Sequence, residues 1–275
     1  MPVRVTKVRW YLRNLLNLMI ALGRIGIYFV RRPKEVSKML FSLFSTVNEF
    51  YQYSHGQLYS FESTKTHQAL KDQLVFAQCN FFSADAKVAR PVETQILASL
   101  VAYLKPKTIF EIGTYNGFTT IHFASNSPPD TRVYTLDLPA DFGKQFSGAK
   151  KLSNYSYDDL LVVKLSMKNI HNRVFHNHPT QKKITELFGD SMNFDFSPYY
   201  KKMDLVYIDG SHAYKYVESD THNAFKMLTD NGVIIWHDFD FIIHRDVFRY
   251  LNQLVKTHKI YSIPNTRFAI YGPCL

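Results

Sequence analysis

Cysteine is scarce in this chain, which has two cysteines among 275 residues and no Cys-x-x-Cys pair. So few thiols exclude a disulfide-stabilised scaffold and a structural zinc site built from cysteine ligands. The apolar N-terminal stretch also lacks length: its uncharged part, residues 14–23, is ten residues long. A membrane-spanning helix needs about 20 apolar residues. We therefore predict a cytoplasmic protein that does not span a membrane.

Acidic residues are missing from the N-terminal segment, residues 1–34. The first acid is Glu35, and eight basic residues precede it. From Glu35 onward, 25 basic residues face 23 acidic ones, so most of the net charge of +10 lies in this one segment. The nearly neutral remainder offers no basic groove for a phosphate backbone, and no nucleic-acid partner is predicted.

The same segment has the pattern of an amphipathic helix. Between residues 10 and 30, polar side chains such as Arg13, Asn17 and Arg24 recur at roughly helical spacing and leave a wide apolar face. Such a helix can lie in an anionic membrane interface, where each basic side chain adds about 1 kcal/mol. It can also pack against the domain or a partner chain. Both interpretations stay open: peripheral membrane contact through residues 1–34, or a packed helix.

Residues 36–53 repeat a helical pattern, whereas residues 57–71 show no clear period. We therefore predict a helical N-terminal extension over residues 1–85 and a second domain over residues 86–275. Two roles fit this extension, which are covering a substrate cleft and forming a homodimer.

A turn with two glycines follows the apolar run 108–112, which is rich in β-branched and aromatic residues. That run is typical of a strand buried on both faces of a parallel sheet. Gly113 and Gly117 let the backbone turn sharply towards a ligand, and the helix that follows offers N–H groups at its start. The spacing Glu-x-Gly-x-x-x-Gly lacks the middle glycine of the dinucleotide motif Gly-x-Gly-x-x-Gly, which disfavours NAD.

Polar residues also follow the other predicted strands. Asp137 ends the strand 132–137, twenty residues beyond Gly117, where a carboxylate can accept both hydroxyls of a ribose. Asp190 and Ser191 follow the strand 184–188. Because the carboxyl ends of parallel strands share one edge of a sheet, these side chains are expected to lie together.

The cluster Asp209-Gly-Ser-His212 follows the predicted strand 203–208 and is the most informative one. It places a hard oxygen ligand and a base that titrates near neutrality at one strand end. A fifth strand, 233–238, delivers a further acid, Asp238.

The pattern predicts an α/β fold with a doubly wound, Rossmann-like and mostly parallel sheet. Helices are expected over residues 91–104, 118–125, 217–229 and 247–255, with Asp230-Asn-Gly232 stopping the third. Residues 259–263 and 267–271 are expected to form an antiparallel hairpin. The insertion 140–183 is too long for an ordinary crossover and is expected to act as a lid over a substrate.

The stretch Glu111-Ile-Gly113-Thr-Tyr-Asn-Gly117 resembles the first motif of class I S-adenosylmethionine-dependent methyltransferases. The resemblance covers about residues 86–275 and is strongest with small-molecule O-methyltransferases of the macrolide-sugar (macrocin) and catechol types. It implies that Glu111, Gly113 and Gly117 hold the methionine part of the cofactor. Asp137 would then bind the ribose, while Asp190 and Ser191 would bind the adenine amino group.

The resemblance also implies a divalent ion such as Mg²⁺, held here by Asp209 and Asp238. The family usually has Asp, Asn or Glu beside the second of these acids, whereas Asp238 is flanked by His237 and Phe239. Either His237 or Asp240 completes the set, or the protein works without a metal.

We predict an enzyme that moves a methyl group from S-adenosylmethionine to a hydroxyl of a small acceptor, of sugar or phenol type. His212 is the expected general base and Asp209 its catalytic neighbour. Two alternatives remain: an NAD-dependent oxidoreductase on the same scaffold, and a non-catalytic, cofactor-binding protein associated with a membrane.

Overall fold

The computed structural model describes residues 58–72, 77–79, 90–142, 163–168, 170–241, 243–273 and 275. All of them belong to the compact unit Gln52–Leu275. The predictions for residues 1–34 and 36–53 fall outside the described residues, as do residues 143–162 and 169 of the predicted lid. Within the described part of the chain, no helix has the length and apolar character needed to cross a membrane.

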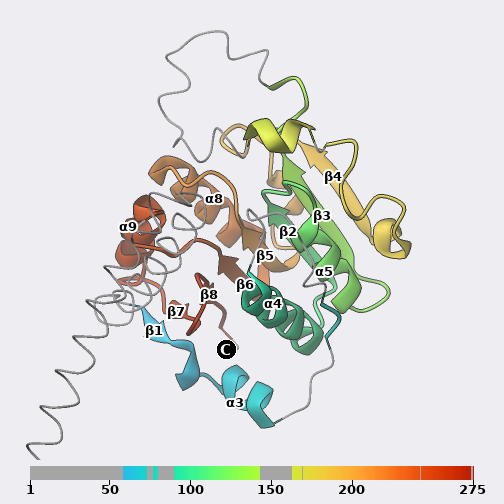
Figure 1. Ribbon diagram of the computed structural model, residues 1–275. Helices are drawn as coiled ribbons and strands as arrows, with labels where there is room; N and C mark the ends of the chain where they lie inside the picture. Colours follow the sequence, from blue (N-terminus) through green and yellow to red (C-terminus); the bar gives the residue numbers. More distant parts are fainter. Residues whose placement is uncertain are drawn as a thin grey trace, which may run out of the picture. The chain divides into compact units, whose positions relative to one another are not determined.

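One mixed sheet of eight strands organises this unit, in the order β1-β7-β8-β6-β5-β2-β3-β4 (Figure 1). The strands are β1 (Tyr59–Ser60), β2 (Thr108–Ile112), β3 (Arg132–Asp137), β4 (Ile184–Phe188), β5 (Met203–Ile208), β6 (Leu228–Trp236), β7 (Tyr261–Ser262) and β8 (Ala269–Tyr271). The main α-helices of the described part are α3 (Lys65–Asp72), α4 (Pro91–Leu104), α5 (Phe118–Asn126), α8 (Tyr214–Met227) and α9 (Arg245–Leu254). Short 3-10 helices are η1 (Phe61–Ser63), η3 (Pro179–Lys183) and η4 (Ser197–Tyr199).

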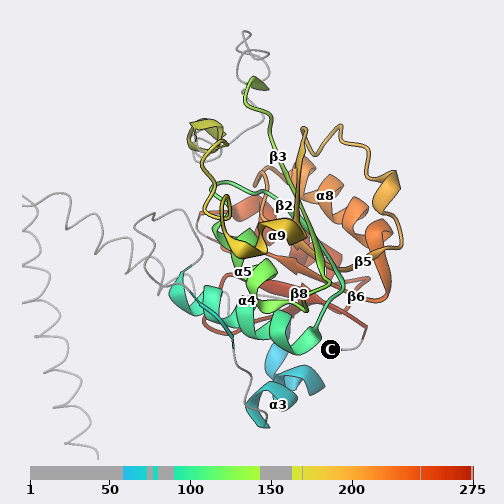
Figure 2. The ribbon, with the colours of Figure 1, turned by 90° about the vertical axis from the view of Figure 1, so that its right-hand side faces the viewer.

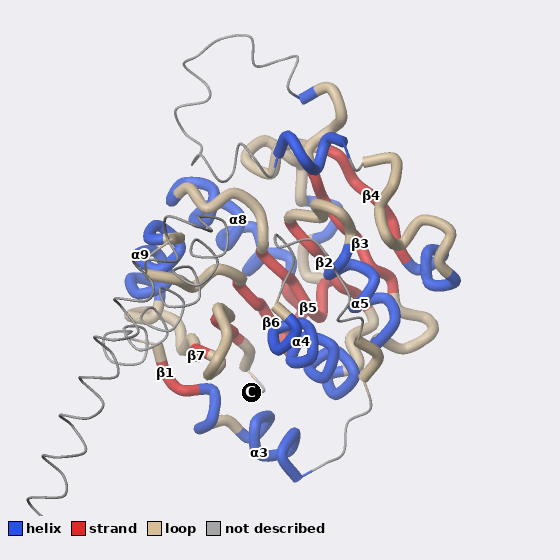
Figure 3. The backbone as a smooth tube through the Cα atoms, viewed as in Figure 1, coloured by secondary structure: helices blue, strands red, loops and turns tan. Residues whose placement is uncertain are grey.

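Strands β6, β5, β2, β3 and β4 are parallel neighbours and lie side by side in the tube view (Figure 3). Strand β8 is antiparallel to both β6 and β7. The chain builds β2, β3 and β4 outward on one side and then returns to place β5 and β6 on the other side of β2. This reversal next to β2 is where doubly wound sheets bind ligands. The predicted fold class is confirmed.

Each face of the sheet is covered by a pair of helices (Figure 2). Helices α4 and α5 bury Leu97, Val101 and Phe123 on one face, against the alternate residues of the strands that point that way. Helices α8 and α9 bury Val217 and Leu251 on the other face. Strand β2 is therefore buried on both faces, as its apolar run predicts.

Some predicted element boundaries are wrong. Helix α8 ends at Met227, and residues 230–232 do not stop it but lie within β6. The register between β5 and β6 shifts there, because Met203 pairs with Leu228 whereas Leu205 pairs with Val233. The turn-forming residues Asp-Asn-Gly thus sit in an irregular stretch of the strand.

Residues before the predicted domain boundary also contribute to the sheet. Strand β1 pairs in parallel with β7, which joins Tyr59 to Tyr261. The unperiodic stretch 57–71 therefore holds an edge strand and helix α3. The predicted boundary between residues 85 and 86 itself falls outside the described residues.

Candidate active site

The carboxyl ends of the central strands are tied together one residue beyond each strand. The Gly113 N–H donates to the Leu136 carbonyl, the Asp209 N–H to the Ile112 carbonyl and the His237 N–H to the Ile208 carbonyl, at 2.8–3.0 Å. This ladder holds the first residues after β2, β5 and β6 in a fixed row. The site residues that follow are therefore placed by the sheet.

At Gly113 the turn after β2 comes closest to the loop after β5. Its φ of 101° lies in the left-handed region, and a Cβ there would be 2.0 Å from the Asp209 carbonyl oxygen. Only glycine fits such a position. The turn after β2 and the loop after β5 therefore touch through Gly113 and Asp209.

A pocket opens at this edge between the ends of β2, β3, β4 and β5. Its walls are formed by Ile112, Gly113, Tyr115, Leu136, Asp137, Leu138, Val163, Ser166, Gly189, Asp190, Ser191, Asp209, Gly210, Ser211 and Tyr216. Five of the predicted site residues thus line one pocket, from all four strand ends: Gly113, Asp137, Asp190, Ser191 and Asp209.

Asp137 is the best-connected carboxylate of this pocket. Its Oδ2 accepts from the Tyr115 N–H at 3.0 Å and from the Ser166 hydroxyl, and its Oδ1 accepts from the Leu138 N–H at 2.8 Å. The Arg173 guanidinium, which is fully buried, lies 3.1 Å from Oδ2. Tyr115 has a φ of 50°, rare for an aromatic residue, and the bond to Asp137 helps to hold it there.

Two predicted cofactor residues do not reach the pocket wall. Glu111 is fully buried beneath the turn, where Oε2 accepts from the hydroxyls of Thr120 and Thr135. Gly117 starts α5 with a φ of 81° and lies under the Phe175 ring, which is 2.5 Å from where a Cβ would stand. Both residues therefore shape the turn from below.

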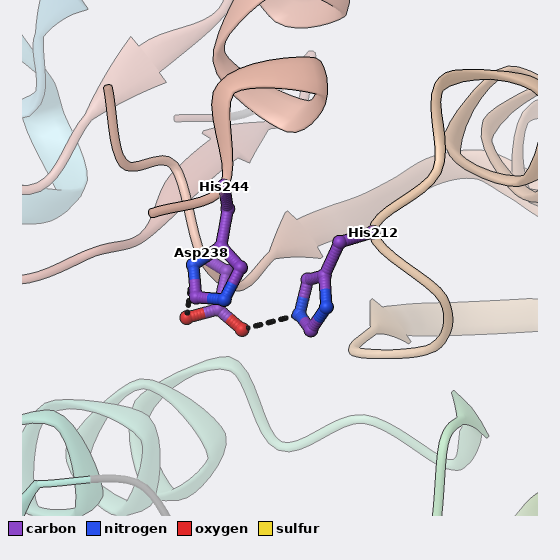
Figure 4. Close-up of side chains that lie close together, drawn as sticks. All are labelled: His212, Asp238 and His244. Carbon is purple, nitrogen blue, oxygen red and sulfur yellow. Dashed lines mark hydrogen bonds and ion pairs between the residues drawn. The ribbon is translucent and has the colours of Figure 1, made fainter. Parts of the chain in front are cut away.

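His212, His237, Asp238 and His244 form a cluster beside the Asp209 end of the pocket. His212 Nε2 lies 2.8 Å from Asp238 Oδ2, and His244 Nδ1 lies 3.3 Å from Asp238 Oδ1 (Figure 4). The His212 and His244 rings stack with their centroids 4.0 Å apart. The predicted base thus has a carboxylate at hydrogen-bonding distance, an arrangement that orients an imidazole.

Asp238 stays ionised although it is buried. Burial alone would raise the pKa of its carboxyl, but His237, Arg267 and His244 outweigh burial and hold this pKa well below its usual value. Arg267 NH1 is 2.6 Å from Asp238 Oδ1, the closest of these contacts. Asp238 also has a φ of 57°, and backbone in this sparsely populated region clusters at functional sites.

Glu93 is the charged residue behind this cluster. Its carboxylate accepts from the Arg267 backbone N–H and guanidinium and from the Arg90 N–H, and its Oε2 lies 3.5 Å from His237 Nε2. Burial opposes ionisation, yet His237, Arg267 and Arg90 hold the pKa of Glu93 far below its usual range. Burial and Arg267 lower the pKa of His237, but Asp238 and Asp209 outweigh them and raise this pKa well above its ordinary value.

The predicted metal ligands are brought together. Asp209, His237 and Asp238 each offer one ligand atom, and these atoms lie within 4.8 Å of one another. Asp240 lies elsewhere in the loop, where its Oδ1 accepts from the Ile243 N–H at 2.8 Å. The residues present thus fit a divalent ion with His237 as the third ligand.

The sequence interpretation missed Glu93, Arg173, His244 and Arg267. Glu93 interrupts the apolar positions of α4, and a buried acid in such a face signals a distant partner. No local pattern links Arg267 to Glu93, because 174 residues separate them.

Comparisons with known proteins match this chain to methyltransferases. A family model described as a methyltransferase domain matches residues 110–239, and a model described as O-methyltransferase matches residues 61–154. A curated relative, "Probable caffeoyl-CoA O-methyltransferase 3" of Dictyostelium discoideum, is 24% identical over 184 residues. The match covers 65% of this chain and 62% of that protein. Catechol O-methyltransferase B of Danio rerio is 40% identical over 47 residues, covering 17% of this chain and 18% of that protein.

Among solved structures, a methyltransferase of Podospora anserina with SAH bound superposes with a TM-score of 0.50 at 13% identity. The superposition covers 75% of this chain and 92% of that one, and shows a shared fold. Together these similarities support a class I S-adenosylmethionine-dependent O-methyltransferase. The chain spans less than two thirds of the length of the curated relatives it matches.

Proposed function

We propose that this protein transfers the methyl group of S-adenosylmethionine to a hydroxyl oxygen of a small-molecule acceptor. The proposal depends on one observation: the pocket and the His212–Asp238 pair lie next to each other at one edge of the sheet. A pocket with acids at successive strand ends meets the His212–Asp238 pair, and Asp209 belongs to the wall between them. The two family-model matches support this reaction over the oxidoreductase alternative.

The pocket supports cofactor binding through its acids. Asp137 at the end of β3 suits the two ribose hydroxyls, and Asp190 with Ser191 after β4 suits the adenine amino group. Gly113 leaves the backbone open to the methionine part, while Glu111 and Gly117 support the turn from beneath. The NAD-type arrangement would need a glycine that this turn does not have.

His212 is the proposed general base. With its Nε2–H donated to Asp238, the imidazole carries its lone pair on Nδ1 and can take the acceptor's hydroxyl proton there. As the oxygen forms its bond to the methyl carbon, the carbon–sulfur bond breaks and its electron pair stays on sulfur. The sulfonium becomes a neutral thioether, and the proton leaves with His212. Alignment of hydroxyl and methyl within about 3–3.5 Å supplies much of the acceleration.

Asp209, Asp238 and His237 are the residues that would hold a divalent ion in this reaction. A bound ion would lower the pKa of an acceptor hydroxyl next to it. The negative charge of Asp238 contributes in either case, because it stabilises the His212 imidazolium formed by proton transfer.

The test is incubation of the full chain with labelled S-adenosylmethionine and a panel of sugars, catechols and lipids, with and without a chelator. Label in a hydroxyl of one acceptor class supports the proposal and identifies the class. Cofactor binding without transfer to any member of the panel would instead favour a non-catalytic cofactor-binding protein.

For the N-terminal segment we propose a role in location and not in chemistry, because residues 1–34 carry eight basic residues and no acid. The expected location is the cytoplasm, with peripheral contact to anionic membranes through this segment. Removal of residues 1–34 should abolish binding to anionic liposomes and leave S-adenosylmethionine affinity unchanged. Full-length protein that ignores such liposomes at low salt would favour a helix packed on the domain or in a homodimer.

A further inference from the structure

The spacing of ligand atoms beside the pocket suits a small ion. His237 Nδ1 lies 3.1 Å from Asp209 Oδ1 and 3.4 Å from Asp238 Oδ2. Atoms that each lie about 2.0–2.2 Å from one ion in tetrahedral or octahedral geometry are themselves about 3–3.5 Å apart. Both distances fall in this range, and all three ligand atoms lie within 4.8 Å of one another.

The donor set differs from that of an all-oxygen site. The residue after Asp238 is Phe239, which is buried and stacks on Phe248 at 5.0 Å, so this position supplies no oxygen. The third donor is the imidazole nitrogen of His237. Mg²⁺ demands oxygen ligands and several retained waters, whereas imidazole favours zinc, iron, nickel and copper.

The groups behind His237 favour its use as a ligand. Its Nε2 faces Arg267 Nη2 at 3.4 Å and Glu93 Oε2 at 3.5 Å. A carboxylate behind a histidine is the usual device that turns the other nitrogen towards a metal. Arg267 occupies Asp238 Oδ1 at 2.6 Å, whereas Oδ2 faces both His212 Nε2 at 2.8 Å and His237 Nδ1 at 3.4 Å. Glu93 and Arg267 hold each other in place, because the Arg267 guanidinium also binds the Glu93 carboxylate.

We propose that Asp209 Oδ1, His237 Nδ1 and Asp238 Oδ2 form a transition-metal site of the zinc class that selects against Mg²⁺. The role of this ion in methyl transfer rests on the proposed function, but the site itself does not. An ion of this class accepts imidazole and thiolate ligands and lowers the pKa of a bound hydroxyl more strongly than Mg²⁺ does.

A second set of atoms near Asp238 is the competing location. His212, Asp238 and His244 also bring three ligand atoms within 4.8 Å of one another (Figure 4). There, however, His244 faces Asp238 Oδ1, the oxygen that Arg267 already holds at 2.6 Å. An ion bound at that oxygen would stand next to a guanidinium, which disfavours it.

The test uses full-length protein freed of metal with a chelator and titrated with Co²⁺, without cofactor or acceptor. Co²⁺ replaces zinc and reports imidazole and carboxylate coordination by its visible absorption. We expect one Co²⁺ for each chain, displaced by an equal concentration of Zn²⁺ but not by a large excess of Mg²⁺. Absence of a visible band at millimolar Co²⁺, or displacement by equimolar Mg²⁺, would overturn the proposal.

Variants locate the site. His237→Ala should lower Co²⁺ affinity by more than about 100-fold, and Glu93→Gln, which keeps the shape, by about 10–100-fold. The control His171→Ala changes an exposed histidine and should bind as the unmodified protein does. Loss of binding in His244→Ala with normal binding in His237→Ala would place the ion in the competing set and contradict the proposal. A chain that binds Co²⁺ but transfers no methyl group would contradict the proposed function alone.

Discussion

Glu93 and Glu111 are two equally buried glutamates with opposite ionisation. Neither side chain is exposed, yet the pKa of Glu93 is held far below its usual range, whereas burial raises the pKa of Glu111 to about 8. Glu93 has Arg90, Arg267 and His237 around it. Partners therefore decide which carboxylate keeps its charge, and depth alone does not.

The two glutamates belong to two regions with different proposed roles. Glu111 lies under the turn of the cofactor pocket, a region built from hydroxyls and backbone N–H groups. Glu93 lies behind His237 and Asp238, in a region of interlocked charges. The comparison predicts that changes in the first region alter cofactor affinity and pH response, and that changes in the second alter turnover and folding.

The largest expected effect is on turnover. His212→Ala should lower the turnover rate by about 10²–10⁴-fold, because the acceptor proton loses its base, while S-adenosylmethionine affinity changes little. Steady-state kinetics and titration calorimetry measure the two quantities. His222→Ala, an exposed histidine on α8, is the control. A variant at position 212 with near-normal turnover would show that the base lies elsewhere.

Folding should respond most to loss of Arg267. Arg267→Met leaves Glu93 and Asp238 buried with less opposing charge, which should cost about 3–5 kcal/mol of unfolding free energy. Urea denaturation at neutral pH measures this cost. Arg249→Met breaks an exposed pair with Asp246 and should cost less than about 1 kcal/mol. Equal effects of the two variants would contradict the role given to the buried charges.

The pH response should separate the two glutamates. Since the folded pKa of Glu111 is raised to about 8, its contribution to stability is fully present below the unfolded pKa near 4.3 and is lost as pH rises to about 8. Glu93 has the opposite sign, because its depressed pKa gives stability above the unfolded pKa that is lost as pH falls.

Glu111→Gln should therefore remove a fall in unfolding free energy of up to about 1.4 kcal/mol for each pH unit between about pH 5 and 8. Urea denaturation at several pH values tests this slope. An unchanged slope would mean that Glu111 is ionised in the folded protein at neutral pH.

The smallest expected effect is on cofactor affinity. Asp137→Ala should weaken S-adenosylmethionine binding by about 1–3 kcal/mol, because two ribose hydroxyls lose a charged acceptor. Calorimetric titration measures the change, and the exposed acid Asp195 supplies the control Asp195→Ala. Unchanged affinity in Asp137→Ala would show that the ribose is bound by another group.

The parts of the site that lie directly after strands could be predicted from the sequence. Asp137, Asp190 and Asp209 were predictable because a buried run, its length and the residue after it are local features. Their convergence follows from parallel strands sharing one edge. The strand-end acids needed no knowledge of distant contacts.

The charged support of the site could not be predicted in the same way. Glu93 and Arg267 meet only because α4 and the β7–β8 hairpin pack at the same end of the sheet. The irregular part of β6 was predicted wrongly for a related reason. Asp-Asn-Gly usually stops an element, but here it lies between Leu228 and Val233, which both pair with β5. Edge strand β1 has two residues, too few to show a period.

The contact between Gly113 and Asp209 limits how this protein can be engineered. The turn after β2 lies directly against the backbone carbonyl of Asp209, a proposed catalytic residue. The turn and the loop after β5 therefore cannot be redesigned separately at this contact. A substitution that resizes the turn would also shift Asp209. Changes to the cofactor pocket are therefore best made at wall residues outside this contact, such as Val163 and Tyr216.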